Sequence, residues 1–374
     1  MDKGQKIKHI FGSTARTLLA LTFVFSGFVK AVDPLGTVYK IEDYLKAFGG
    51  FFMDLLPLAG VAAVCLICVE LVLGVCMLVN VRTNWTAWLS LAFYLVMTPL
   101  TLYIALTNPV SDCGCFGDAI VLTNWQTFWK NIVLLGLVII LLCTKRHIPQ
   151  TFIWPVELGI AIVAAGITLG IMGYSYRHLP PIDFRPYQVG NNIPELMEIP
   201  DDAPHDVYET TLIYERDGEQ QAFTLANYPK GDSTWTFVEQ KSVLVQKGYE
   251  PPIHNLAIMT MDYEEITYDI LESEEPVNLV ILYDLSKYDR KQFDKLMAIV
   301  YERPNVYFIT GSTEDEIVAL AEELGWDEEM TFSTFCYADP VTLKTIVRAN
   351  PGLVVIQNGT IIEKHNFRNI EINL

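Results

Sequence analysis

Five long apolar stretches limit what this chain can fold into more than any other feature. They cover residues 11–32, 58–79, 85–106, 128–143 and 152–174. A helix of about 20 apolar residues crosses the hydrocarbon core of a bilayer. The intervening residues 33–54 are polar enough to form a loop or a helix at the membrane interface. We therefore predict an all-α membrane domain of five transmembrane helices, in contact with membrane lipid, followed by a water-soluble region.

Charge divides the chain at the same place. Residues 1–177 contain 12 basic and 9 acidic side chains, whereas residues 178–374 contain 14 basic and 35 acidic side chains. An acidic surface repels nucleic acid and anionic lipid headgroups, so we expect neither as a partner of the second half. The histidines are scattered without the spacing of metal ligands, and no phosphate-binding loop or nucleophile elbow is present. The sequence therefore predicts neither a metal site nor nucleotide chemistry.

The basic residues between the apolar stretches predict the orientation of the chain. Those flanking the stretches fall on one side of the membrane: Lys3, Lys6, Lys8, Arg82, Lys145 and Arg146. By the positive-inside rule that side is the cytoplasm. The N-terminus is then cytoplasmic, and everything after residue 177 faces the opposite compartment. In a bacterial inner membrane that compartment is the periplasm, where disulfides can form.

A pair of cysteines lies in the segment Ser111–Asp118, between the third and fourth apolar stretches. Two cysteines in an exposed loop have no packing role, so we predict that Cys113 and Cys115 are reactive. A bond between them would close a small, strained ring that is easily reduced. The sequence does not decide between this bond and pairing of each cysteine with another one.

Cys65 and Cys68 are the candidates for such pairing, because their i, i+3 spacing places both thiols on one helical face. Two dithiols at one membrane rim would resemble the relay of vitamin K epoxide reductase, in which a helix pair passes electrons to quinone. In the alternative interpretation these two residues, like Cys76 and Cys143, are small apolar side chains that pack a helix bundle.

Arg16 and Glu70 are ionisable residues deep within the apolar stretches. Such groups usually face the interior of a bundle in pairs. We therefore predict an intramembrane ion pair between Arg16 and Glu70, with proton transfer by Glu70 during quinone chemistry as the alternative. Lys30 and Glu157 are nearer the helix ends, and we expect them to reach the interface.

Residues 178–250 are predicted to be a β-rich linker region, since Asp217-Gly218 between strand-like runs is a hairpin signal. Residues 251–374 predict an α/β domain with three layers around a mixed sheet. Its expected strands are residues 277–283, 306–310, 353–357 and 361–364, and its expected helices are residues 290–301, 313–324 and 340–347.

Part of this domain resembles the thioredoxin fold. Asn350-Pro351-Gly352, directly before a strand and an Asn-Gly hairpin, is similar to the cis-proline loop of thioredoxin-like proteins, which implies a cis bond before Pro351. The segment Asp284–Arg290 has no cysteine where that family carries Cys-x-x-Cys. The resemblance thus implies a degenerate module for binding or docking. Its single cysteine, Cys336, either forms a mixed disulfide with the loop cysteines or is a buried small side chain.

The membrane region also resembles a known family. Arg16, Phe25–Lys30 and Asp33-Pro34 are similar to the first helix of DoxX-type proteins. Asp112–Gly117 resembles the signature loop of the methylamine-utilisation protein MauE, of the same superfamily. The resemblance covers residues 10–145 and implies a four-helix membrane domain, to which residues 150–176 add a fifth transmembrane helix. It implies a role in disulfide formation in periplasmic proteins, or in quinone-linked sulfur oxidation as in DoxX relatives.

Three hypotheses of function follow from these features. In the first, an inner-membrane thiol–disulfide oxidoreductase exchanges electrons between Cys113, Cys115 and periplasmic client proteins, with quinone as a candidate cofactor. In the second, the protein is a non-catalytic membrane scaffold or assembly factor with a docking domain. In the third, it is a DoxX-like subunit of a quinone-linked oxidoreductase, and the loop cysteines are structural.

Overall fold

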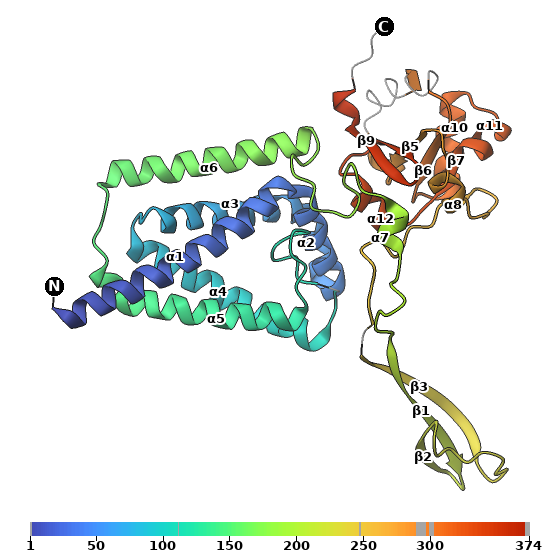
Figure 1. Ribbon diagram of the computed structural model, residues 1–374, viewed down its shortest axis with the longest axis horizontal. Coiled ribbons are helices and arrows are strands. Elements are labelled where there is room, and N and C mark those ends of the chain that lie inside the picture. The colour runs from blue at the N-terminus through green and yellow to red at the C-terminus, as the bar shows by residue number, and fades with distance from the viewer. Residues whose placement is uncertain (1, 111, 247, 289–296, 299–302, 371–374) are drawn as a thin grey trace.

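The computed structural model describes residues 2–110, 112–246, 248–288, 297–298 and 303–370. Within these residues five helical segments are long and apolar enough to cross a membrane. They are α1 (Lys3–Val32), η1 with α3 (Gly50–Leu58 and Ala59–Leu78), α4 (Thr83–Thr107), α5 (Asn124–Thr144) and α6 (Trp154–Arg177). The five predicted helices are confirmed, and the first, second and fourth begin earlier in the chain than predicted. Figure 1 shows α1, α3, α4 and α5 as a bundle, with α6 beside α3.

Helices α1 and α3 approach each other closely because glycines lie at their contact. A Cβ atom added to Gly27 would lie 2.6 Å from the backbone nitrogen of Leu71, and one added to Gly74 would lie 2.6 Å from the backbone nitrogen of Val24. Small residues allow such backbone contacts between membrane helices. Because these two contacts involve backbone atoms, they determine the register of the two helices.

That register makes the predicted Arg16–Glu70 ion pair wrong. Glu70 pairs instead with Lys30, whose Nζ lies 2.7 Å from Glu70 Oε2. The Arg16 guanidinium donates to the backbone carbonyls of Met77 and Leu78 near the end of α3. The glycine contacts place Glu70 about three helical turns from Arg16 along α1, too far for a direct contact.

The side chain of Lys30 stays inside the bundle, contrary to the prediction that it extends to the interface. The side chains of Lys30 and Glu70 are each 6% exposed. Glu157 is buried as well, and its Oε2 lies 2.8 Å from Arg82 Nε. Each of these buried groups has a partner of opposite charge, which offsets the cost of removing a charge from water.

The substitution Gly27→Ala is expected to lower the stability of the bundle by about 1–3 kcal/mol, the usual cost of overpacking a close contact. The new Cβ would meet the backbone of Leu71, which cannot move aside as a flexible side chain would. Thermal unfolding in detergent would measure the loss. The control is Gly166→Ala on α6, where an added Cβ has no neighbour within 4 Å. Equal losses in both variants would contradict this account.

A three-stranded antiparallel sheet follows the last membrane helix. It consists of β1 (Val207–Arg216), β2 (Glu219–Thr224) and β3 (Thr236–Gln246) in the order β2-β1-β3. The predicted hairpin is confirmed, since Asp217 and Gly218 join β1 to β2 with φ values of 55° and 82°. Figure 1 shows this sheet projecting away from the rest of the molecule.

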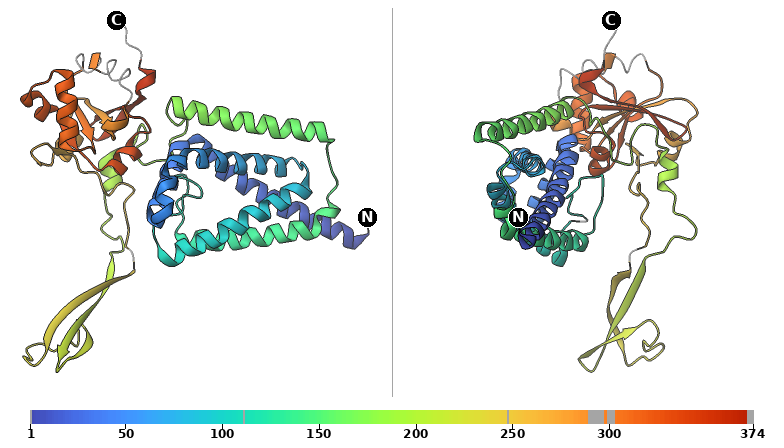
Figure 2. Two further views of the ribbon diagram at one scale, coloured as in Figure 1. Left: turned by 180° about the vertical axis from the view of Figure 1, so that it is seen from behind. Right: turned by 60° about the vertical axis from the view of Figure 1, so that its left-hand side comes forward.

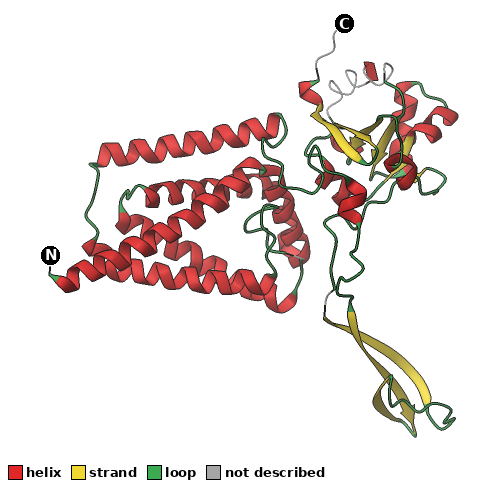
Figure 3. Cartoon of the chain, viewed as in Figure 1, coloured by secondary structure: helices red, strands yellow, loops and turns green. Residues whose placement is uncertain are grey.

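The carboxy-terminal domain contains a six-stranded mixed sheet in the order β4-β7-β6-β5-β8-β9. Strands β5 (Val277–Leu282), β6 (Val306–Thr310) and β7 (Phe335–Tyr337) are parallel, whereas β4 (Met259–Thr260), β8 (Gly352–Gln357) and β9 (Thr360–Asn366) are antiparallel to their neighbours. The four predicted strands are confirmed. The two that were not predicted, β4 and β7, are only two and three residues long. Figure 3 distinguishes this sheet from the helical region.

Helices cover both faces of this sheet. Leu279 and Ile281 of β5 pack in one core cluster with α8 (Thr267–Leu271) and α12 (Pro340–Ile346). Val280 and Leu282 pack in a second cluster with α10 (Glu314–Leu324) on the opposite face. The three predicted layers are therefore present. The helices α7 (Ile193–Met197), α8 and α11 (Glu328–Thr334) were not predicted. The helix predicted over residues 290–301 lies outside the described residues except for 297 and 298.

Candidate functional site

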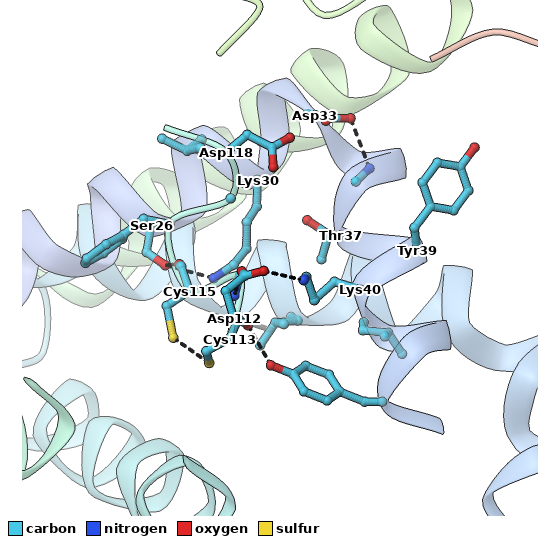
Figure 4. Close-up of a pocket in the computed structure, with 18 of the residues that line it drawn as sticks. Ser26, Lys30, Asp33, Thr37, Tyr39, Lys40, Asp112, Cys113, Cys115 and Asp118 are labelled. Carbon is cyan, nitrogen blue, oxygen red and sulfur yellow. Dashed lines mark hydrogen bonds and ion pairs between the residues drawn. The ribbon is translucent and has the colours of Figure 1, made fainter. Parts of the chain in front are cut away.

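The cysteine loop, residues 112–118, lies at the end of the bundle next to the carboxy-terminal domain and opposite the N-terminus (Figure 2). Helix α2 (Pro34–Phe48) lies at the same end and corresponds to the predicted interfacial helix. It begins there because the Asp33 side chain accepts a hydrogen bond from the Gly36 N–H and Pro34 occupies the first turn. Helix α2 forms one wall around the loop (Figure 4).

Helix α2 holds the first part of the cysteine loop. Lys40 Nζ lies 2.8 Å from Asp112 Oδ1, and the Tyr44 hydroxyl donates to the Cys113 carbonyl at 2.8 Å. Asp112 also accepts from the Gly114 N–H at 2.8 Å, and Gly114 has a φ of 64°, which favours glycine. Burial raises the pKa of Tyr44, so the phenol remains a neutral donor. These contacts hold the first part of the cysteine loop against α2.

A buried polar network holds the second part of the loop. Ser26 Oγ lies 2.7 Å from the Cys115 carbonyl oxygen and 2.7 Å from Glu70 Oε2. It also accepts from Lys30 Nζ at 2.8 Å. A hydroxyl has one proton, so Ser26 donates to either the carbonyl or the carboxylate at a given time. The network therefore connects the backbone of Cys115 to a buried ion pair.

The two loop cysteines lie side by side. Their Sγ atoms are 2.9 Å apart, and both residues are half-buried, which corrects the prediction of an exposed loop. The hydrogen bond from Cys113 lowers the pKa of Cys115 to about 6, and the positive charges of Lys130 and Lys30 act in the same direction against burial. Donation of that hydrogen bond, together with burial, raises the pKa of Cys113. The positive charges near Cys115 therefore favour Cys115 over Cys113 as the ionised member of the pair.

A cavity of about 550 Å³ extends from the cysteine loop into the bundle. Both cysteines, Lys30 and Glu70 line it. The wall farther inside is mostly apolar and aromatic, with side chains from α1, α3 and α4: Phe23, Ala62, Leu66, Phe93, Tyr94, Met97, Leu100 and Ile104. The site therefore combines a thiol pair with a space suited to an amphiphilic molecule.

The predicted second dithiol is not part of this site. Helix α3 lines the cavity with Ala62, Leu66 and Glu70, which share one helical face. Cys65 is exposed on the outside of the bundle, and Cys68 is packed against a different apolar cluster. The structure therefore does not bring Cys65 and Cys68 together with the loop cysteines.

Of the remaining cysteines, Cys76 and Cys336 agree with the interpretation as small packing residues, and Cys143 does not. Cys76 is buried, whereas Cys143 is exposed on the surface of the bundle. Cys336 lies on β7 and is 2% exposed within the core of the sheet. Burial raises the pKa of Cys336 to about 12, so at neutral pH it remains a thiol.

Pro351 lies in the loop before β8, and the bond from Asn350 to Pro351 is cis, the isomer that the sequence predicts. The Asn350 side chain donates to the carbonyl of Asp284 at 2.7 Å, which ties this loop to the end of β5. The described residues contain no group of three or more His, Cys, Asp and Glu side chains with the arrangement of a metal site.

Sequence reasoning missed Ser26, Tyr44 and Lys130 as site residues. Ser26 and Lys30 are four residues apart, and this spacing alone predicts that they share one face of a helix. Tyr44 and Lys130 gave no such signal, because they reach the cysteine loop only through the packing of α2 and α5 around it.

Comparison with known proteins agrees with this description of the membrane domain. Residues 8–144 match the family model of the methylamine utilisation protein MauE, and residues 208–247 match a domain of unknown function. No curated protein and no solved structure matches the chain. The first match includes α1 to α5 and the cysteine loop. Together with the five candidate spans, it identifies the chain as a membrane protein whose residues 8–144 form a MauE-like region.

Proposed function

We propose that this protein carries out thiol–disulfide exchange, with Cys113 and Cys115 as the reacting residues. The observation that carries the proposal is the 2.9 Å separation of their sulfur atoms beside a cavity in the membrane domain. When the two thiols are oxidised to a disulfide, they release two electrons and two protons. When a client dithiol reduces that disulfide, one client thiolate attacks a loop sulfur, which forms a mixed disulfide and releases the other loop cysteine as a thiolate. The second client thiolate then attacks the client sulfur of the mixed disulfide, which forms the client disulfide and releases the second loop cysteine.

The charged groups around the pair support this reaction. In this exchange the client thiolate is the nucleophile, and the loop cysteine with the lower pKa is the better leaving group. Cys115 is that cysteine, because its pKa is lowered to about 6. Ser26 Oγ lies 2.7 Å from the Cys115 carbonyl oxygen and 2.7 Å from Glu70 Oε2, so it links the loop backbone to the buried ion pair. Both loop cysteines are therefore candidates for catalysis, and Ser26 and Glu70 are candidates for positioning the loop.

The apolar part of the cavity favours quinone as the electron acceptor. A bound quinone would supply a lipid-soluble acceptor of two electrons and two protons. The residues present fit such a molecule, because Phe23, Phe93 and Tyr94 offer aromatic surface along the cavity wall. The same argument supports the quinone-linked alternative, in which the chain is part of a larger oxidoreductase.

The proposed location is the bacterial inner membrane, with the carboxy-terminal domain in the periplasm. The N-terminal segment and the connection between α5 and α6, which carries Lys145 and Arg146, lie at the end of the bundle opposite the cysteine loop (Figure 1). Basic residues favour the cytoplasmic side of a membrane. The order β6-β5-β8-β9 and the loop containing Pro351 support a thioredoxin-like relationship for the soluble domain.

Alkylation trapping of thiols in intact membranes tests the proposed exchange. We expect Cys113 and Cys115 to be protected from alkylation after oxidation and released by reductant, with mass mapping to identify the bond. Cys113→Ser and Cys115→Ser should each abolish this change. Cys143→Ser, which removes an exposed cysteine of the bundle, should preserve it. Loop thiols that remain reduced in an oxidising medium would contradict the proposed exchange and favour the scaffold or assembly-factor hypothesis.

A further inference from the structure

The carboxy-terminal domain contacts the cysteine loop directly through Arg348. Its Nε lies 2.9 Å from Asp33 Oδ2, and its Nη2 lies 3.3 Å from Asp118 Oδ2. The Arg348 side chain is 7% exposed. Asp33 is the residue that caps α2, and Asp118 is the last residue of the cysteine loop. One guanidinium from the soluble domain therefore binds both the helix that supports the loop and the loop itself.

A second group of contacts lies beside the ion pairs of Arg348. The Tyr39 hydroxyl of α2 lies 3.0 Å from the Tyr283 hydroxyl, directly after β5. Lys344 of α12 lies above both rings, with its Nζ 5.0 Å from the Tyr39 centroid and 5.7 Å from that of Tyr283. Burial raises the pKa of both tyrosines, so neither carries a negative charge at neutral pH. The contact thus joins charged, aromatic and hydrogen-bonded groups.

The cysteine loop is consequently held at both ends by ion pairs. Lys40 of the membrane domain binds Asp112 at the start of the loop at 2.8 Å. Arg348 of the soluble domain binds Asp118 at its end. Burial raises the pKa of Asp118, and the charge of Arg348 opposes that change. Separation of the domains would leave Asp118 and Asp33 without this cation.

We infer that the surface formed by Tyr283, Lys344 and Arg348 binds the membrane domain of the same chain, and that Arg348 is a positioning residue for the Cys113–Cys115 loop. The soluble domain therefore completes the site. This inference rests on the proposed function only in treating the cysteine loop as an exchange site. The contact between Arg348 and the loop can be tested without measuring redox activity.

The test uses the full-length protein in membranes with all loop thiols reduced. The rate at which a membrane-impermeant maleimide labels Cys113 and Cys115 would be measured for Arg348→Met and Asp118→Asn. We expect both variants to be labelled about ten- to a hundredfold faster, since charge-assisted hydrogen bonds bias a local opening by that factor. Arg348→Lys should restore part of the protection, because an ammonium keeps the charge without the planar fork.

Two controls separate positioning from simple unfolding. Arg303→Met removes an arginine that pairs with Glu363 on the same domain, and it should not change the labelling of the loop. Labelling of Cys336, buried in the sheet core, reports unfolding of the soluble domain. If Arg348→Met exposes Cys336, Asp118→Asn alone decides the question. Unchanged labelling of the loop cysteines in Asp118→Asn would overturn the inference, whether or not redox trapping succeeds.

Discussion

Glu70→Gln is expected to destabilise the protein by about 3–5 kcal/mol, the usual cost of removing one partner of a buried ion pair. Lys30 Nζ lies 2.7 and 2.8 Å from the two Glu70 carboxylate oxygens, and both side chains are 6% exposed. Without the carboxylate, the ammonium group would remain buried and uncompensated. The loss would be measured as a lower midpoint of thermal unfolding in detergent.

The double variant Lys30→Met with Glu70→Leu distinguishes an ion pair from simple packing. Removing both charges also removes the cost of burying them, so the double variant should recover most of the lost stability. Glu157→Gln is a second comparison, and we expect a smaller loss because its partner Arg82 is 37% exposed. A double variant less stable than Glu70→Gln would contradict the buried-charge explanation.

Alkylation of Cys115 is expected to follow a titration with a midpoint near pH 6, the value to which the pKa of this thiol is lowered. The largest cause is the hydrogen bond from Cys113, followed among the favourable ones by the charge of Lys130. Because the thiolate reacts and the thiol does not, labelling should fall as the pH drops below this midpoint. Cys113→Ala removes the hydrogen bond, so the midpoint should rise toward ~8.5, the ordinary value for a cysteine.

Lysine variants give the matched comparison for this titration. Lys130→Met should raise the midpoint by less than Cys113→Ala does, because the charge of Lys130 has the smaller influence. Lys46→Met removes another cation of the cavity wall that has no part in lowering the pKa of Cys115, and it should leave the midpoint unchanged. A wild-type midpoint near 8.5 would show that Cys115 is an ordinary thiol.

The sequence by itself determined the parts of this protein that depend on neighbouring residues. The five membrane spans follow from the length of the apolar runs, and the β1–β2 hairpin follows from Asp217-Gly218. Helix α10 begins after Thr313, whose backbone N–H donates to Glu316 at 3.0 Å, as its capping motif predicts. Each of these features is decided within a few residues, so local patterns are sufficient.

The tertiary structure alone decided which distant groups meet. Glu70 binds Lys30 and not Arg16 because the backbone contacts of Gly27 and Gly74 determine the register of α1 and α3. Cys65 and Cys68 share a helical face, but a different face of α3 lines the cavity. Arg348 and Asp118 are separated by 230 residues and meet only because the carboxy-terminal domain packs against the bundle. Apolar periodicity indicates that a helix has a buried face, but the packing against its neighbours sets which side chains meet there.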